Sequence, residues 1–113
     1  MDYDVELRFQ KLVKKLEDKF GDGLELDSIV LLIGVQELGK GYQNFSKDEK
    51  MNLMHIAICT ILEPYGFYKF IENDEEGWPH FEKLKNIPPI SNREQEHLMK
   101  EAVISYFETN EYV

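Results

Sequence analysis

The chain has 113 residues, 42% of them hydrophobic, and its formal net charge is −9. This length and composition indicate one globular domain and exclude a disordered chain, and the acidic excess argues against binding to nucleic acid or to an anionic membrane, since both attract clustered Lys and Arg. With one cysteine, no secretory signal and no apolar run long enough to cross a bilayer, we expect a cytoplasmic protein without an internal disulfide.

Residues 2–20 predict an amphipathic helix. Acidic residues lead this segment and lysines follow, which is the order that the helix dipole favours. The Gly-Asp-Gly sequence at 21–23 ends the helix. The hydrophobic residues recur at spacings of three and four and therefore share one helix face; they are Val5, Phe9, Leu12, Leu16 and Phe20.

A second helix is expected to start at Asp27 or Ser28, either of which can cap it. Nearly every residue up to Val35 is hydrophobic, which is typical of a buried helix. Gly34 lowers helix stability by about 1 kcal/mol relative to Ala, so we expect a neighbouring helix to pass close to it. Leu24–Leu32 also resembles the Asp-Ser-Leu segment of acyl carrier proteins, and over these few residues the resemblance implies that Ser28 would carry a phosphopantetheine arm.

Two segments begin with a capping box, in which a serine and a glutamate three residues later bond each other's free backbone N–H groups. Ser46 and Glu49 start the third predicted helix, which runs to about Leu62. Ser91 and Glu94 start the fourth. The inner face of the fourth helix is expected to hold Leu98, Met99, Ala102, Val103, Tyr106 and Phe107.

The segment between these two helices is rich in aromatic residues. Two short runs, 67–72 and 78–83, flank a polar turn that ends in Gly77, and together they predict a β-hairpin. A short helix over 65–72 is the competing interpretation. Pro79 would confine the second run to an edge strand. Because an isolated hairpin is marginally stable in water, we expect it to pack against the helices.

The predicted fold is therefore mainly α. We expect a four-helix bundle-like single domain over residues 1–113, with a small aromatic β-hairpin between the third and last long helices. The second and third helices are expected to lie at its centre.

His55 and Cys59 lie four residues apart and so share a face of the third predicted helix. This spacing can supply two metal ligands, but a zinc site needs at least three. Glu63, Tyr68 or His80 would complete a site if the hairpin folded back over this helix, which makes His55, Cys59 and His80 the metal candidates. The surrounding apolar residues instead favour a buried, inert thiol and a water-excluded imidazole, and this is the prediction we adopt.

Two other patterns point to metals less completely. Glu94–His97 has the Glu-x-x-His spacing of dinuclear iron bundles, but such sites need a second copy and two further glutamates. Glu72–Lys83 has the acidic spacing of a calcium-binding loop, but its twelfth residue is lysine instead of a bidentate glutamate. We therefore expect no cofactor, no metal and no catalytic residues.

The leading functional hypothesis is a small acidic, non-enzymatic module that binds a protein partner or forms a homo-oligomer such as a homodimer. Six aromatic residues within 65–81 exceed what one hairpin needs for its own packing, and half-exposed aromatics are favoured contact residues. The alternative for these residues is that they complete the core. The acidic surface also suits a basic partner. The predicted contact set is Tyr65, Tyr68, Phe70, Trp78 and Phe81.

The second functional hypothesis is a small-molecule or metal-binding protein. Its site would lie near His55 and Cys59, and its chemistry would depend on which groups the hairpin brings to them.

Overall fold

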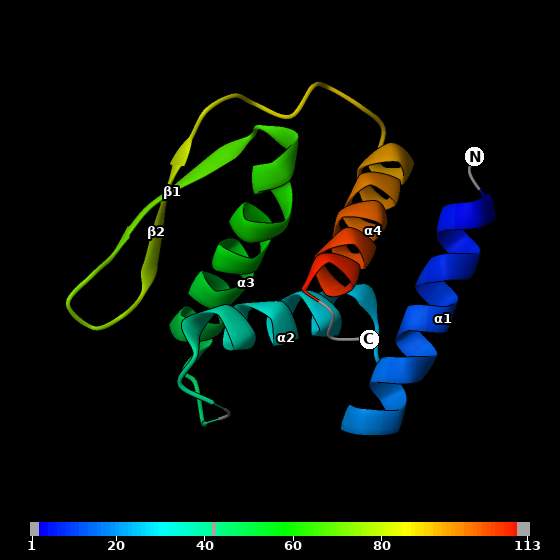
Figure 1. Cartoon of the computed structure of the whole chain (residues 1–113), viewed down its shortest axis with the longest axis horizontal. Coiled ribbons are helices and arrows are strands. Elements are labelled where there is room, and N and C mark those ends of the chain that lie inside the picture. Colours follow the sequence, from blue (N-terminus) through cyan, green and yellow to red (C-terminus); the bar gives the residue numbers. More distant parts are fainter. Residues whose placement is uncertain (1–2, 42, 111–113) are drawn as a thin grey trace. The chain divides into compact units, whose positions relative to one another are not determined.

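The computed structural model describes residues 3–41 and 43–110. Over these residues the chain forms four α-helices, one short 3-10 helix and a two-stranded antiparallel hairpin between the third and fourth α-helices (Figure 1). The predicted mainly α class with an inserted hairpin is confirmed. The chain divides into two compact units, which we call the α1–α4 unit, from the described parts of 1–26 and 88–113, and the hairpin unit, from those of 27–87. A single domain over 1–113 stays a prediction.

The α1–α4 unit pairs α1 (Tyr3–Phe20) with α4 (Asn92–Thr109). Four residues of the predicted α1 stripe are buried, whereas Phe20, the last residue of the helix, is 54% exposed. The inner face of α4 is half-buried at Leu98 and Met99. It is fully buried at Ala102, Val103, Ile104, Tyr106 and Phe107.

Charged side chains connect α1 and α4. Lys100 Nζ bonds both carboxylate oxygens of Glu6 at 3.1 and 3.2 Å and lies 3.4 Å from Glu96. Its ammonium group also lies 5.1 Å from the centre of the Phe9 ring. Partial burial acts to lower the pKa of Lys100, but the hydrogen bonds and charge of Glu6, together with Glu96, outweigh it and raise the pKa above 10.5.

The hairpin unit is built on α2 (Leu26–Leu38) and α3 (Lys47–Leu62). α2 starts at Leu26, one or two residues before the predicted start, so Asp27 and Ser28 lie inside its first turn and the predicted capping role is wrong. A Cβ atom at Gly34 would lie 2.2 Å from the carbonyl oxygen of Leu53. The backbones of α2 and α3 therefore meet at Gly34, as predicted, because only a residue without a side chain fits there.

Both predicted capping boxes are present. The Ser46 hydroxyl accepts the N–H of Glu49, and the Glu49 carboxylate accepts the N–H of Ser46. Ser91 and Glu94 make the same two bonds at the start of α4. After α3, the chain makes the 3-10 helix η1 (Glu63–Tyr65).

The hairpin consists of β1 (Tyr68–Asn73) and β2 (Pro79–Lys83), so the helical alternative for 65–72 is wrong. Phe70 pairs with Phe81, and a bulge follows between Phe70 and Glu72. The hairpin packs against α3, as expected for strands that are unstable alone (Figure 1).

Candidate binding cleft between α3 and the hairpin

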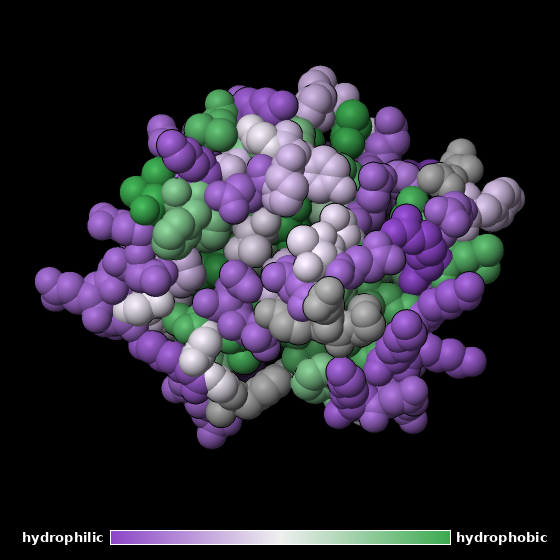
Figure 2. Space-filling model, in the orientation of Figure 1, coloured by the Kyte–Doolittle hydropathy of each residue, from purple (hydrophilic) through white to green (hydrophobic). Residues whose placement is uncertain are grey.

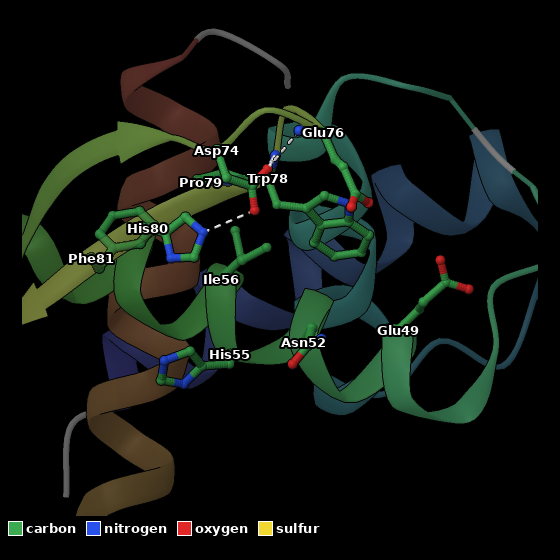
Figure 3. A pocket seen from close by; sticks show the side chains of 10 residues that line it. All are labelled: Glu49, Asn52, His55, Ile56, Asp74, Glu76, Trp78, Pro79, His80 and Phe81. Carbon is green, nitrogen blue, oxygen red and sulfur yellow. Dashed lines mark hydrogen bonds and ion pairs between the residues drawn. The ribbon is translucent and has the colours of Figure 1, made fainter.

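A cleft of about 430 Å³ lies between α3 and the hairpin, inside the hairpin unit (Figure 3). The spacing of Glu49, Asn52 and Ile56 places them on one face of α3, and His55 lies at the edge of that face. Figure 3 shows these side chains on one wall and the hairpin side chains on the other. The hairpin wall consists of Asp74, Glu76, Trp78, Pro79, His80 and Phe81.

Asp74 organises the hairpin wall. Its Oδ1 accepts the backbone N–H groups of Glu76 and Trp78 at 3.0 and 2.9 Å, and its Oδ2 lies 2.9 Å from Nε2 of His80 (Figure 3). The hydrogen bond with His80 and then that from the Trp78 N–H lower the pKa of Asp74 below 3.8. The turn closes at Gly77, whose φ of +87° suits glycine. This side chain therefore sets the turn and remains ionised.

Trp78 connects the cleft to the core. The indole ring is half-buried and packs against the buried cluster of Val35, Leu38 and Leu53. Phe81, also half-buried, meets Phe70 edge to face with ring centres 5.7 Å apart. Trp78 thus both lines the cleft and packs on the core, whereas Phe81 lines the cleft and packs on its cross-strand partner Phe70.

The other predicted contact residues lie elsewhere. Tyr65 and Tyr68 are half-buried, whereas Phe70 is 42% exposed. Tyr68 meets the His55 ring edge to face at 6.3 Å. Partial burial and then the nearby Cys59 thiol raise the pKa of Tyr68. Of the five residues, the cleft brings together Trp78 and Phe81.

The prediction that water is excluded from both His55 and Cys59 is wrong for the histidine. Cys59 is 0% exposed, but His55 is exposed and lines the cleft. The hairpin places Tyr68 beside the His55 ring but does not cover it, so the imidazole faces the cleft. Burial raises the pKa of the Cys59 thiol to about 11. The protonated thiol can therefore donate to Nε2 of His55, 3.6 Å away.

The structure does not gather the three metal candidates into one site. His80 bonds Asp74, while His55 pairs with Cys59. Within the described residues, no group of three or more His, Cys, Asp and Glu side chains is arranged to hold a metal ion. Residues 72–83 form the hairpin turn and its flanking strands, which differs from the helix–loop–helix of a calcium-binding hand.

The cleft carries a strong negative charge. Glu49, Asp74 and Glu76 contribute carboxylates, and none of the described residues that line the cleft is a lysine or arginine. A second, smaller cavity of about 140 Å³ in the α1–α4 unit is lined by Arg8, Lys11 and Lys15, with Glu108 paired to Arg8 at 2.7 Å. Of these two cavities, the cleft beside the hairpin is the larger, and it is lined by carboxylates without a lysine or arginine among its described residues.

In comparisons with known proteins, no family model, curated protein or solved structure matches the chain. Among the described residues, no helix is both long enough and apolar enough to cross a membrane.

Sequence reasoning did not assign six of the ten described lining residues to a binding site: Glu49, Asn52, Ile56, Asp74, Glu76 and Pro79. The acidic turn before Gly77 signalled the charge at the hairpin tip but not what it faces. The pattern Glu49, Asn52, Ile56 does predict one helix face. Nothing in the sequence indicates that this face meets the hairpin tip.

Proposed function

We propose that this protein is a non-enzymatic interaction module that binds a protein partner through the cleft between α3 and the hairpin. The observation that carries this proposal is the pair of half-buried rings, Trp78 and Phe81, exposed in a concave surface. Aromatic side chains in such pockets are the usual centres of binding energy in protein interfaces. The hairpin that carries both rings packs against α3, which limits the conformational entropy that the rings lose on binding.

The chemistry of the cleft favours binding over catalysis. Three of its titratable side chains are already held by bonds of the fold, Glu49 in the capping box and Asp74 with His80 in the hairpin turn. Figure 2 shows a largely hydrophilic surface on one face, with hydrophobic residues in small separate groups. The part of the surface seen there therefore favours a limited contact over a broad apolar interface.

A small organic ligand is the second candidate. The volume of about 430 Å³ falls within the range of ligand pockets, and His55 lines the cleft. Native mass spectrometry of the purified protein distinguishes the two candidates. A bound small molecule appears as a defined mass increment, whereas a protein partner or a second copy appears as a larger complex.

The substitution Asn52→Arg tests the interaction proposal. Asn52 is exposed in α3 and lines the cleft, and arginine favours a helix more than asparagine does. The long side chain should fill the cleft without unfolding the helix. We expect affinity purification with quantitative mass spectrometry to show partners that bind the wild type and are lost from this variant.

The matched control is Gln10→Arg. Gln10 is an exposed amide in α1 and does not line the cleft, so the charge change is the same. It should retain every partner of the wild type. If Asn52→Arg retains the same proteins, and the same oligomeric state in sedimentation, the cleft is not the binding site and the proposal is wrong.

A further inference from the structure

We propose, on the basis of the interaction function above, that the cleft receives an arginine side chain from a basic segment of the partner protein. The first support is charge. Glu49, Asp74 and Glu76 line the cleft, and none of the described lining residues is Lys or Arg. The chain as a whole carries a net charge of −9 and would attract a basic segment from a distance.

The carboxylates retain capacity for an incoming donor. Glu49 accepts one backbone N–H through Oε1 in its capping box, and Asp74 accepts the bonds of the turn and of His80. A carboxylate offers about four acceptor positions, so these bonds fix the side chains in place without using them up. The incoming group would meet charges that are already oriented.

The second support is the apolar surface that accompanies the charge. Trp78 and Phe81 present partly exposed rings, while Ile56 and Pro79 line the cleft beside them. An arginine has an apolar stem that packs on such surfaces and a planar cation that stacks on aromatic rings. The combination fits an arginine better than a small inorganic cation, which has no apolar part.

One cation of the chain lies near the cleft. Lys40 donates to the backbone carbonyl of Glu76 at the hairpin turn, but it is not among the described residues that line the cleft. The incoming arginine would therefore bind beside this lysine, with the carboxylates of Glu49 and Asp74 elsewhere in the lining.

The experiment is a titration of the ¹⁵N-labelled full chain by NMR. The probe is the capped peptide Gly-Gly-Arg-Gly-Gly, and the control peptide carries citrulline, which keeps the shape of arginine but has no charge. We expect shifts in the amides of 49–56 and 74–81 with the arginine peptide. Binding of the citrulline peptide should be about tenfold weaker, because its hydrogen bonds lack the charge.

Two protein variants locate the effect. Glu76→Gln removes one carboxylate from the cleft. It should lower the affinity for the arginine peptide by about threefold, the size expected for an exposed ion pair. Glu75→Gln makes the same change one residue away, at an exposed position that does not line the cleft, and should leave binding unchanged. Equal losses in both variants would indicate attraction by net charge alone and would overturn the proposal.

The remaining outcomes also decide the question. Equal binding of the arginine and citrulline peptides, or no shifts in the cleft, overturns the arginine assignment. A lysine peptide that binds as tightly as the arginine peptide overturns the preference for a planar cation. If Asn52→Arg still loses the partners of the wild type in any of these cases, the cleft remains the binding site. Only the assignment of arginine as the group that enters it is then wrong.

Discussion

At the scale of single residues, Asp74 has the largest structural role in the cleft. It receives two backbone N–H groups of the hairpin turn and pairs with His80, so one carboxylate positions Glu76, Trp78 and His80 together. These hydrogen bonds keep Asp74 ionised, because they lower its pKa by more than desolvation raises it.

Replacement of Asp74 by Asn should reduce the change in the free energy of unfolding as the pH falls into the acid range. The pKa of Asp74 is lower in the folded chain than its ordinary value of 3.8. Its contribution to stability is therefore present above pH 3.8 and is lost as the pH falls through the folded pKa. We expect Asp74→Asn to be less stable than wild type at neutral pH and the gap to narrow below about pH 4.

Urea unfolding followed by the fluorescence of Trp78, the only tryptophan, measures this gap at each pH. The neighbouring Glu75→Gln is the control for loss of one exposed acid. A gap that stays constant from neutral to acid pH would contradict the assigned role of the Asp74 charge.

At the scale of elements, the contact of α2 with α3 depends on one missing side chain. Gly34 lies in the interior of α2, where glycine weakens a helix by about 1 kcal/mol relative to alanine. In return, the backbone of α3 at Leu53 approaches so closely that a Cβ atom would overlap its carbonyl group. A glycine that weakens the helix locally is thus required by the packing of α2 on α3.

Gly34→Ala should destabilise the hairpin unit despite its better helix propensity. The new methyl group would lie 2.2 Å from the Leu53 oxygen and 2.7 Å from its carbon, and neither backbone atom can rotate away. We expect a net loss of about 1–3 kcal/mol, the usual cost of overpacking. Urea unfolding monitored by Trp78 fluorescence tests this, and an unchanged or higher midpoint would show that α2 and α3 separate without strain.

At the scale of the whole molecule, the chain joins two compact units, and the cleft belongs to one of them. Trp78 makes binding and stability of the hairpin unit interdependent, because its ring both lines the cleft and packs on Val35, Leu38 and Leu53. A partner that covers this ring would therefore stabilise the hairpin against α3.

Trp78→Ala should consequently lower both stability and partner binding. We expect a loss of roughly 2 kcal/mol, below the 3–5 kcal/mol of a fully buried large aromatic residue, because Trp78 is half-buried. Far-UV circular dichroism in urea measures it, since the variant lacks the fluorophore. Trp78→Phe, which keeps an aromatic ring, should lose less. Unchanged stability in the alanine variant would place the ring on the surface alone.

The elements could be predicted from local patterns because their causes are local. Ser46 with Glu49, and Ser91 with Glu94, satisfy backbone N–H groups only three residues away, and the stripe of α1 follows from helical spacing. The hairpin followed from its polar turn and aromatic flanks. The end residues of helices were predicted less accurately: α2 starts at Leu26, before the predicted Asp27 or Ser28.

The sequence by itself thus determined the four helices, the hairpin, the acidic charge and the need for a close approach at Gly34. The tertiary structure alone decided that His55 is exposed while Cys59 is buried, and that Trp78 and Phe81 share a cleft with three carboxylates. The physical reason is that burial depends on which distant segment covers a residue. Neighbours in sequence specify capping bonds and turns, but they cannot specify which side chains of α3 the distant hairpin covers.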